Sequence, residues 1–186
     1  FEGRRAVGVR FRQNGRLVEA RARREVVLSA GAVGSPQILQ LSGVGPADWL
    51  AEFGIAPVLD KQGVGRNLQD HLQQRAIYKV EGVKTLNMTY HSLVGRALMG
   101  LQYALFQSGP LTMAPSQLGI FTTSSSDQER TNIQFHCQPL SLDRFGEPLH
   151  RFPAVTVSAC NLRPTSRGSV RLASLDPAAA PLIAPN

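Results

Sequence analysis

The chain has 186 residues, enough for one ordinary domain or two small ones with a hydrophobic core. Its composition, 42% hydrophobic and 18% charged, excludes an intrinsically disordered chain, and two cysteines are too few for a disulfide-stapled secreted scaffold. The formal net charge is +7, and arginines gather near the start of the chain. Because they alternate with valines and alanines at strand spacing, they indicate a solvated sheet face or a contact with another part of the protein rather than a nucleic-acid site.

The start of the chain is predicted to form β-structure. Val9 and Phe11 alternate with arginines, and Asn14-Gly15 is a strong signal for a two-residue hairpin turn. A third strand is expected over residues 25–29, whose continuous apolar run predicts burial on both faces.

The stretch GAVGSPQILQLSGVG, residues 31–45, follows this strand directly. Ser35 is a good N-cap and Pro36 suits the first helical position, where a missing N–H costs nothing. A short helix is therefore expected over 37–41, and Gly43 is placed to end it.

The glycines of the chain do not spell a nucleotide-binding motif. Residues 43–45 and 63–65 both read GxG, but neither continues as GxGxxG or follows a strand directly. Small residues at Ala30, Gly31 and Ala32 are instead expected to end the third strand. They either let a flat or bulky group approach the backbone or simply allow tight packing of strand on helix, and spacing alone leaves both possibilities open.

Further elements are expected along the rest of the chain. They are a helix that starts at Pro46 and ends at Gly54, strands over 55–59 and 75–80, a helix over 90–107 with leucines at helical spacing, and strands over 132–138, 154–162 and 169–173. Near residue 70 a glycine-rich sequence gives way to one that reads as a sheet with a helix. This change predicts two parts, 1–70 and 71–186.

The four histidines show no HxxxH, HExxH or His/Cys cluster, so no metal site is expected. His71 follows Asp70, whose carboxylate could orient the imidazole. His136 is expected to be a packed or hydrogen-bonded strand residue, and His91 and His150 to be surface or loop residues. A Ser–His–Asp triad stays open on composition, although no GxSxG element is present to carry its serine.

Residues 31–45 resemble the second signature of the glucose–methanol–choline (GMC) family of FAD-dependent alcohol oxidoreductases and meet it at every position. The flanking sequences REVVLSAGA (24–32) and GVGRNLQDH (63–71) are similar to the family's neighbouring strand and loop. Residues 163–186 resemble its substrate-domain hairpin. These matches occur in the family's order and cover most of the chain.

The resemblance implies an α+β fold with an incomplete flavin-domain portion over 1–70. A partial substrate domain, built on a mostly antiparallel sheet with packed helices, is then expected over 71–186. It also implies that the parent protein oxidises a primary alcohol to an aldehyde with FAD, and that Ala30, Gly31 and Ala32 lie beside the cofactor.

The family's GxGxxG and its catalytic histidine have no counterpart in this sequence. We therefore expect the chain to contain no catalytic residue, to be inactive by itself and to retain no stoichiometric FAD. Its expected partners are an alcohol substrate and the N- and C-terminal segments of the same enzyme. The expected location is the cytoplasm, with association of the parent protein with a membrane as the alternative.

One position of the sequence bears on the identity of the substrate. Choline-oxidising relatives carry an acidic residue two positions after the Asp-His pair, where a carboxylate can neutralise a trimethylammonium group. The neutral Gln73 stands there in this chain, which slightly favours a neutral alcohol over choline because a cation would lose its charge partner. A non-catalytic binding or regulatory module derived from the substrate domain is the alternative function.

Overall fold

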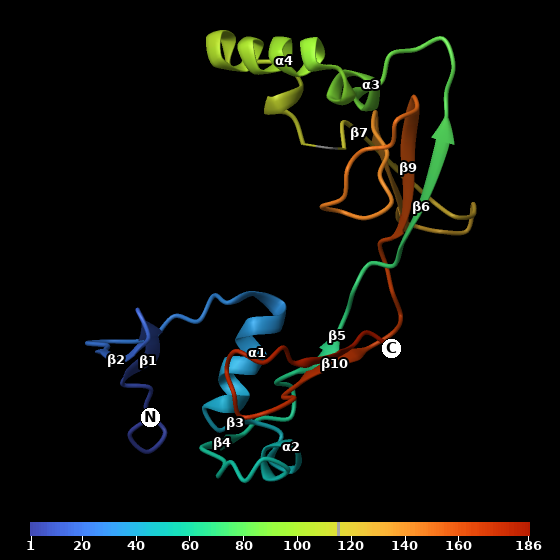
Figure 1. The fold of residues 1–186 in the computed structure, drawn as a ribbon. Helices are drawn as coiled ribbons and strands as arrows, with labels where there is room; N and C mark the ends of the chain where they lie inside the picture. Colours follow the sequence, from blue (N-terminus) through green and yellow to red (C-terminus); the bar gives the residue numbers. More distant parts are fainter. Residues whose placement is uncertain (115) are drawn as a thin grey trace. The chain divides into compact units, whose positions relative to one another are not determined.

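The computed structural model describes residues 1–114 and 116–186, which form two compact units (Figure 1). Unit 1 comprises Phe1–Asp70 and Thr165–Asn186, and unit 2 comprises His71–Pro164. Both contain helices and antiparallel sheets, which confirms the α+β class. The expected change near residue 70 coincides with the boundary. The expected extent of the second part, 71–186, differs from the structure, because residues 165–186 pack in unit 1.

Unit 1 begins with the predicted hairpin. Strands β1 (Gly8–Gln13) and β2 (Arg16–Arg21) pair in an antiparallel register. Between them Asn14 and Gly15 have φ angles of 50° and 78°. Both residues are thus left-handed, as the turn that best matches the twist of paired strands requires.

The expected third strand over 25–29 is wrong. These residues pair with no strand among the described residues, and Val27 is 76% exposed. An apolar run reports a tendency toward burial, whereas a strand exists only where a neighbour supplies hydrogen bonds. The sequence of residues 25–29 indicated the tendency toward burial but not whether a neighbouring strand exists.

Helix α1 (Gly31–Leu41) begins well before the predicted start at Ser35. Ala30 is its N-cap residue and Gly31 has a φ of 76°, so Ala30, Gly31 and Ala32 open a helix and do not end a strand. The Ser35 hydroxyl accepts a hydrogen bond from the Ala30 N–H at 3.1 Å, across the first turn. Pro36 therefore lies inside the helix, where its missing N–H leaves the carbonyl of Ala32 without the usual partner.

The remaining elements of unit 1 are short. Gly43, with a φ of 83°, follows the end of α1 as expected. Helix α2 (Ala47–Ala51) starts after Pro46, as predicted, but it ends at Ala51, and residues up to Gly54, the predicted end, form a turn. The other elements are β3 (Val44–Gly45), which pairs in parallel with β4 (Leu59–Asp60), and an antiparallel sheet in the order β11 (Leu182–Ala184), β10 (Gly168–Arg171) and β5 (Arg66–Leu68).

The side chain of Gln40 joins α1 to this sheet. It is only 1% exposed, its Nε2 donates to the carbonyl of Val170 at 2.9 Å, and its Oε1 accepts from the N–H of Leu172 at 3.3 Å. The amide thus pairs with the β10 backbone as a neighbouring strand would. This contact and the pairing of β10 with β5 explain why residues 165–186 belong to unit 1.

Trp49 connects α2 to the same sheet. Its ring contacts two guanidinium groups, with the Cζ of Arg66 at 4.4 Å and that of Arg171 at 4.6 Å from the ring centroid. Arg171 is also paired with Glu52 at 2.6 Å. Two cation–π contacts to one indole help fix the orientation of α2, and the next residue, Leu50, is fully buried.

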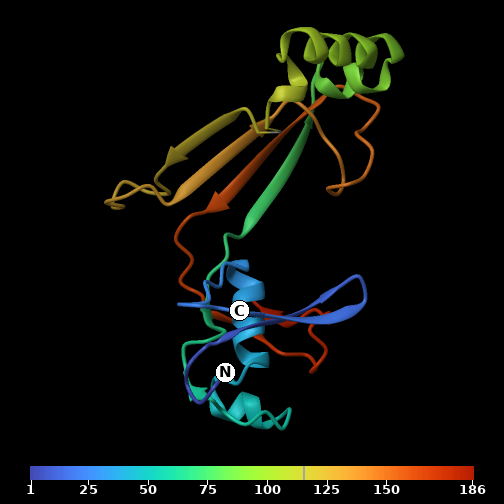
Figure 2. The same ribbon diagram turned by 90° about the vertical axis from the view of Figure 1, so that its left-hand side faces the viewer.

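Unit 2 is built on one antiparallel sheet (Figures 1 and 2), which confirms the mostly antiparallel arrangement. Its strands, in spatial order, are β6 (Gln73–Lys79), β9 (Ala154–Asn161), β8 (Ile133–Gln138) and β7 (Leu118–Thr122). Strands β6, β8 and β9 lie close to the predicted ranges. Strand β7 was not expected.

The predicted helix over 90–107 is divided in the structure. Helix α3 (Leu86–His91) ends at Ser92, whose hydroxyl then accepts a hydrogen bond from the Gly95 N–H at 3.1 Å and caps α4 (Leu93–Phe106). A short 3₁₀ turn, η1 (Pro110–Thr112), follows. No helix among the described residues is long and apolar enough to cross a membrane.

A buried amide holds the loop before β9 against α3. Asn87 is fully buried, its Nδ2 donates to the Ser141 hydroxyl at 2.8 Å and to the Phe152 carbonyl at 3.1 Å, and its Oδ1 accepts from the Ser141 N–H at 2.8 Å. Low-dielectric surroundings make such a network strong when every member is paired. Asn87 therefore fixes both ends of the loop 141–152.

Candidate functional site

One site candidate lies in unit 1, where the first half of α1 faces the loop 65–69. These segments enclose a recess of about 420 Å³ lined by Ala32, Pro36, Gly65, Arg66, Asn67, Leu68, Gln69 and Val170. Ala32 is the one predicted cofactor contact on this lining. Ala30 and Gly31 directly precede it at the start of α1.

The start of α1 offers hydrogen-bond donors. Its N-cap residue makes no side-chain hydrogen bond, and no acidic residue lies in its first turn. The Ala30 N–H is held by the Ser35 hydroxyl, but the next N–H groups, from Gly31 to Val33, have no partner within the helix. A Cβ added at Gly31 would meet nothing within 4 Å, and Gly31 and Ala32 are both exposed. The partial positive charge of a helix N-terminus is thus combined with unobstructed access to the backbone.

The loop on the other side of the recess has a backbone shape that its sequence requires. Gly65 and Asn67 have φ angles of 77° and 60°. A Cβ on Gly65 would lie 2.7 Å from the Gln40 Nε2 and would also meet the Val170 carbonyl. Glycine is therefore required where the loop passes over the Gln40 contact, and the recess adjoins a tightly packed part of unit 1.

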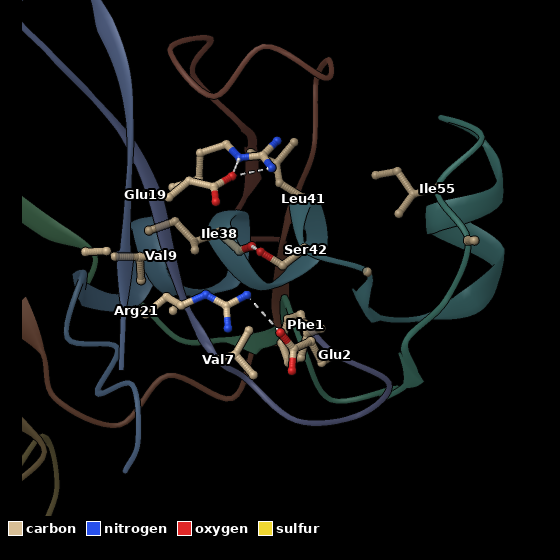
Figure 3. A pocket seen from close by; sticks show the side chains of 15 residues that line it. Phe1, Glu2, Val7, Val9, Glu19, Arg21, Ile38, Leu41, Ser42 and Ile55 are labelled. Carbon is tan, nitrogen blue, oxygen red and sulfur yellow. Dashed lines mark hydrogen bonds and ion pairs between the residues drawn. The ribbon is translucent and has the colours of Figure 1, made fainter. Parts of the chain in front are cut away.

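A larger hollow, of about 690 Å³, lies in unit 1 between the β1–β2 hairpin and α1 (Figure 3). Val7, Val9, Ile38 and Leu41 are among the residues that line it. The charged groups on its lining are paired with each other, Arg10 with Glu19 at 2.6 Å and Arg21 with Glu2 at 2.9 Å. No residue predicted for the site lies there.

The predicted substrate contact, Gln73, belongs to unit 2 and is the exposed first residue of β6. The register places it opposite Cys160, which in turn lies opposite Gln134. Residues directly opposite in adjacent strands share a face of the sheet. Gln73 therefore stands at one edge of a sheet face that continues across β9 and β8.

The same face carries polar groups that the sequence analysis did not assign to a site. Arg75, Ser158, His136 and Gly119 are opposite one another across all four strands. His136 is half-buried, and its imidazole has no hydrogen-bond partner among the described residues. A Cβ on Gly119 would meet nothing closer than 3.9 Å, which leaves room beside the imidazole. The sequence signal that could have identified these four residues is the alternation of side chains along each predicted strand, which places every second residue on the same face.

His91 and His150, expected to be surface or loop residues, are both partly buried, and His150 does lie in the loop 141–152. His150 is 20% exposed in its side chain, with Nδ1 at 3.0 Å from the Ser141 Oγ and Nε2 at 3.3 Å from Asp143. His91 has its Nε2 at 2.7 Å from the Leu149 carbonyl. Both hold the loop that Asn87 also fixes.

The side chains of Asp143, His150 and Ser141 contact one another as in a Ser–His–Asp triad. The serine of this group, however, is not accessible to a substrate. Ser141 is fully buried, and its hydroxyl oxygen already accepts from Asn87. A nucleophile must reach its substrate, so this group is structural. Among residues 1–114 and 116–186, no cluster of three or more His, Cys, Asp or Glu side chains is placed to hold a metal ion.

The remaining candidate pair lies at the boundary between the units. Asp70 is the last residue of the first segment of unit 1, and His71 is the first residue of unit 2. The structure therefore gathers Ala30, Gly31 and Ala32 at one helix start in unit 1, and it gives Gln73 to the sheet of unit 2.

Known proteins resemble this chain along its whole length. The chain is 40% identical over 185 residues to an oxygen-dependent choline dehydrogenase of Chromohalobacter salexigens, covering 98% of this chain and 33% of that protein. It is also 40% identical over 189 residues to an alcohol dehydrogenase [acceptor] of Pseudomonas putida, covering 100% of this chain and 34% of that protein. The chain thus spans about a third of the length of these relatives.

Solved structures share the fold. A formate oxidase superposes with a TM-score of 0.85 at 24% identity, over 97% of this chain and 36% of that one. A pyridoxine 4-oxidase from Mesorbium loti superposes with a TM-score of 0.72 at 25% identity, over 100% of this chain and 32% of that one. A family model described as GMC oxidoreductase matches residues 1–73, which include the whole α1 signature and the loop 65–69. The family model and the relatives confirm the resemblance of residues 31–45 to the GMC oxidoreductase family.

Proposed function

We propose that this chain is part of an FAD-dependent alcohol dehydrogenase that oxidises a primary alcohol to an aldehyde. The observation that carries the proposal is the recess beside the start of α1, which lies within the residues matched by the family model and combines unpaired backbone donors with small side chains. The names of the two relatives that match along the whole chain support the substrate class.

The residues of the recess fit a contact with FAD. The cofactor carries phosphate and carbonyl oxygens, and uncapped N–H groups at a helix start are their natural donors. An exposed glycine with vacant space at its Cβ position permits close approach of a rigid, flat group. Gly31 and Ala32 would hold the cofactor through the backbone, and Ala30 would leave room beside it. When bound, FAD supplies the acceptor for the hydride of the alcohol.

The chain's own side chains would act on the substrate from unit 2. The polar sheet face presents a carboxamide at Gln73 and an imidazole at His136, both able to exchange hydrogen bonds with a hydroxyl group. The face has no carboxylate at the position of Gln73. A neutral alcohol is therefore favoured over a quaternary ammonium alcohol, which would be desolvated there without a counter-charge.

The test of the proposed function uses the complete gene product. We expect a yellow protein whose flavin absorbance bleaches when a primary alcohol is added without oxygen. A colourless protein that does not respond to added FAD would refute the proposal. A yellow protein that no alcohol bleaches would favour the non-catalytic module.

Replacing Ala32 by Asp tests the cofactor contact. The carboxylate would lie in the first turn of α1, where it stabilises the helix by about 0.3–1 kcal/mol. It would also repel the oxygens of FAD, and we expect about a tenfold weaker affinity. Titration of the apoprotein with FAD measures this, and Ala32→Asn is the neutral control of the same shape. Equal affinities for the two variants would remove Ala32 from the cofactor site.

Replacing Gln73 by Glu tests the substrate contact. A carboxylate at this position should raise kcat/KM for choline relative to butan-1-ol by about tenfold, because it supplies the missing counter-charge. The matched control is Gln74→Glu, since Gln74 is the next residue of β6 and points to the opposite face. If both variants shift the ratio of kcat/KM for choline to that for butan-1-ol equally, the shift reflects the added net charge and not a contact of residue 73 with the substrate.

A further inference from the structure

Asn67 has a backbone conformation that is unusual for a residue inside a strand. Its φ of 60° lies in the left-handed region, which residues other than glycine enter at an energetic cost. The other non-glycine residues with a positive φ among the described residues lie in the hairpin turn (Asn14), after the end of α4 (Gln107) and at the last position (Asn186). Asn67 belongs instead to β5, so the pairing of that strand must account for its conformation.

The pairing of β5 with β10 contains a β-bulge at Asn67. Leu68 lies opposite Gly168. Arg66 lies opposite Ser169, the next residue of β10. Asn67 is therefore an extra residue of β5 without a partner across the ladder. A bulge changes the direction of the side chain at its extra residue, and bulges are common beside active sites. Asn67 is also one of the residues that line the recess beside α1.

The bulge is held on both sides by contacts of its neighbours. The Val170 N–H donates to the Gly65 carbonyl at 2.7 Å. On the other side, the side-chain oxygen of Gln69 accepts from Nη1 and Nη2 of Arg167 at 3.0 and 3.2 Å, in the amide orientation that satisfies both polar atoms of Gln69. The Asn67 side chain makes no hydrogen bond among the described residues. The neighbours therefore fix the shape of the loop, and the fold does not depend on the Asn67 carboxamide.

The side chain of Asn67 needs an explanation outside the fold. Glycine would adopt the same conformation at a lower cost, and the loop already has glycine at Gly65. A backbone outlier that serves no internal contact points to a function. A carboxamide donates through Nδ2 and accepts through Oδ1, and FAD carries many oxygen and nitrogen acceptors.

We propose, on the basis of the function proposed above, that the Asn67 carboxamide binds FAD in the recess by donating from Nδ2 to an oxygen or ring nitrogen of the cofactor. Helix α1 would hold the cofactor from one side through its backbone, and Asn67 would hold it from the other through a side chain. The bulge is the device that places this side chain on the recess.

Two substitutions in the complete gene product separate the side chain of Asn67 from its backbone. Asn67→Gly keeps the left-handed conformation and removes the carboxamide. Asn67→Asp keeps the shape and the tolerance of this conformation, but a carboxylate replaces the donor. The apoprotein of each variant is titrated with FAD and followed by the change in flavin fluorescence. We expect the affinity to fall about tenfold for Asn67→Gly and about a hundredfold for Asn67→Asp, whose charge also repels the oxygens of FAD.

The matched control is Asn14→Gly, which removes the side chain of a left-handed asparagine in the hairpin turn of the same unit. Asn14 does not line the recess, so we expect its variant to bind FAD with unchanged affinity. Thermal unfolding of the apoproteins is the second measurement. Because glycine relieves the left-handed backbone, Asn67→Gly should be at least as stable as the wild type while it binds FAD more weakly.

Unchanged FAD affinity in Asn67→Gly would overturn this inference alone, since the loop would then need only its backbone shape. An equal loss of affinity in Asn14→Gly would also overturn it, as would a fall in the thermal stability of the Asn67→Gly apoprotein, which would make the side chain structural. A wild-type apoprotein that binds no FAD would overturn the proposed function and this inference together.

Discussion

Replacing Gln40 by Met is expected to destabilise unit 1 by about 2–4 kcal/mol. Methionine has nearly the same volume, so the change removes hydrogen bonds without leaving a large cavity. The Val170 carbonyl and the Leu172 N–H, which Gln40 now pairs, would remain buried without a partner, and each such group costs about 1–3 kcal/mol. The measurement is urea unfolding followed by the fluorescence of Trp49, the single tryptophan of the chain, which lies in unit 1.

The matched control is Gln37→Met, one turn earlier on the same helix. Gln37 also reaches a backbone carbonyl, that of Ala179 at 2.8 Å, but it is only part-buried, so water can replace the lost bond. We expect a loss below about 1 kcal/mol for the control. If both variants lose the same stability, the pairing of Gln40 with β10 is not what holds residues 165–186 to unit 1.

Replacing Asn87 by Leu is expected to destabilise unit 2 by about 3–4 kcal/mol. Leucine fills the same space but leaves the Ser141 N–H and the Phe152 carbonyl unpaired in a dry environment. The loop 141–152 would then keep only the contact of His91 with the Leu149 carbonyl as its hydrogen bond to α3. Hydrogen exchange of the β9 amides measures the effect, since that strand follows the loop directly and has no tryptophan to report on it.

Asn132→Leu provides the comparison for this prediction. Asn132 makes two hydrogen bonds of 2.8 Å with Ser124 in an exposed turn, where solvent can satisfy the groups it leaves. A loss of about 1 kcal/mol or less is expected there. An equally small loss for Asn87→Leu would show that the loop is held mainly by His91 and His150.

Local signals in the sequence predicted local structure well. The Asn14-Gly15 turn, the helix after Pro46 and the strands near 133–138 and 154–161 depend on neighbouring residues, and the structure contains them. The start of α1 was misjudged for a related reason. Ser35 and Pro36 are typical of a helix start, but Ser35 instead accepts from Ala30 and lets the helix begin earlier.

Features that depend on distant residues could not be predicted. The apolar run at 25–29 gave no information on whether a neighbouring strand exists, and nothing near residue 170 indicates that Gln40 pairs with it. The polar row through His136 likewise exists only because four strands align in one register. The family signature identified the helix that forms one side of the candidate site, while the sheet face of unit 2 required the register.

The division of unit 1 into two segments has a consequence for the order of events during synthesis. The acceptor and donor that Gln40 needs, and the strand that β5 pairs with, emerge from the ribosome only after all of unit 2. Unit 2 is continuous in the chain and can fold while translation proceeds, whereas unit 1 must wait for its closing strand. A ribosome stalled between the two segments would therefore hold a folded unit 2 beside an unfinished unit 1.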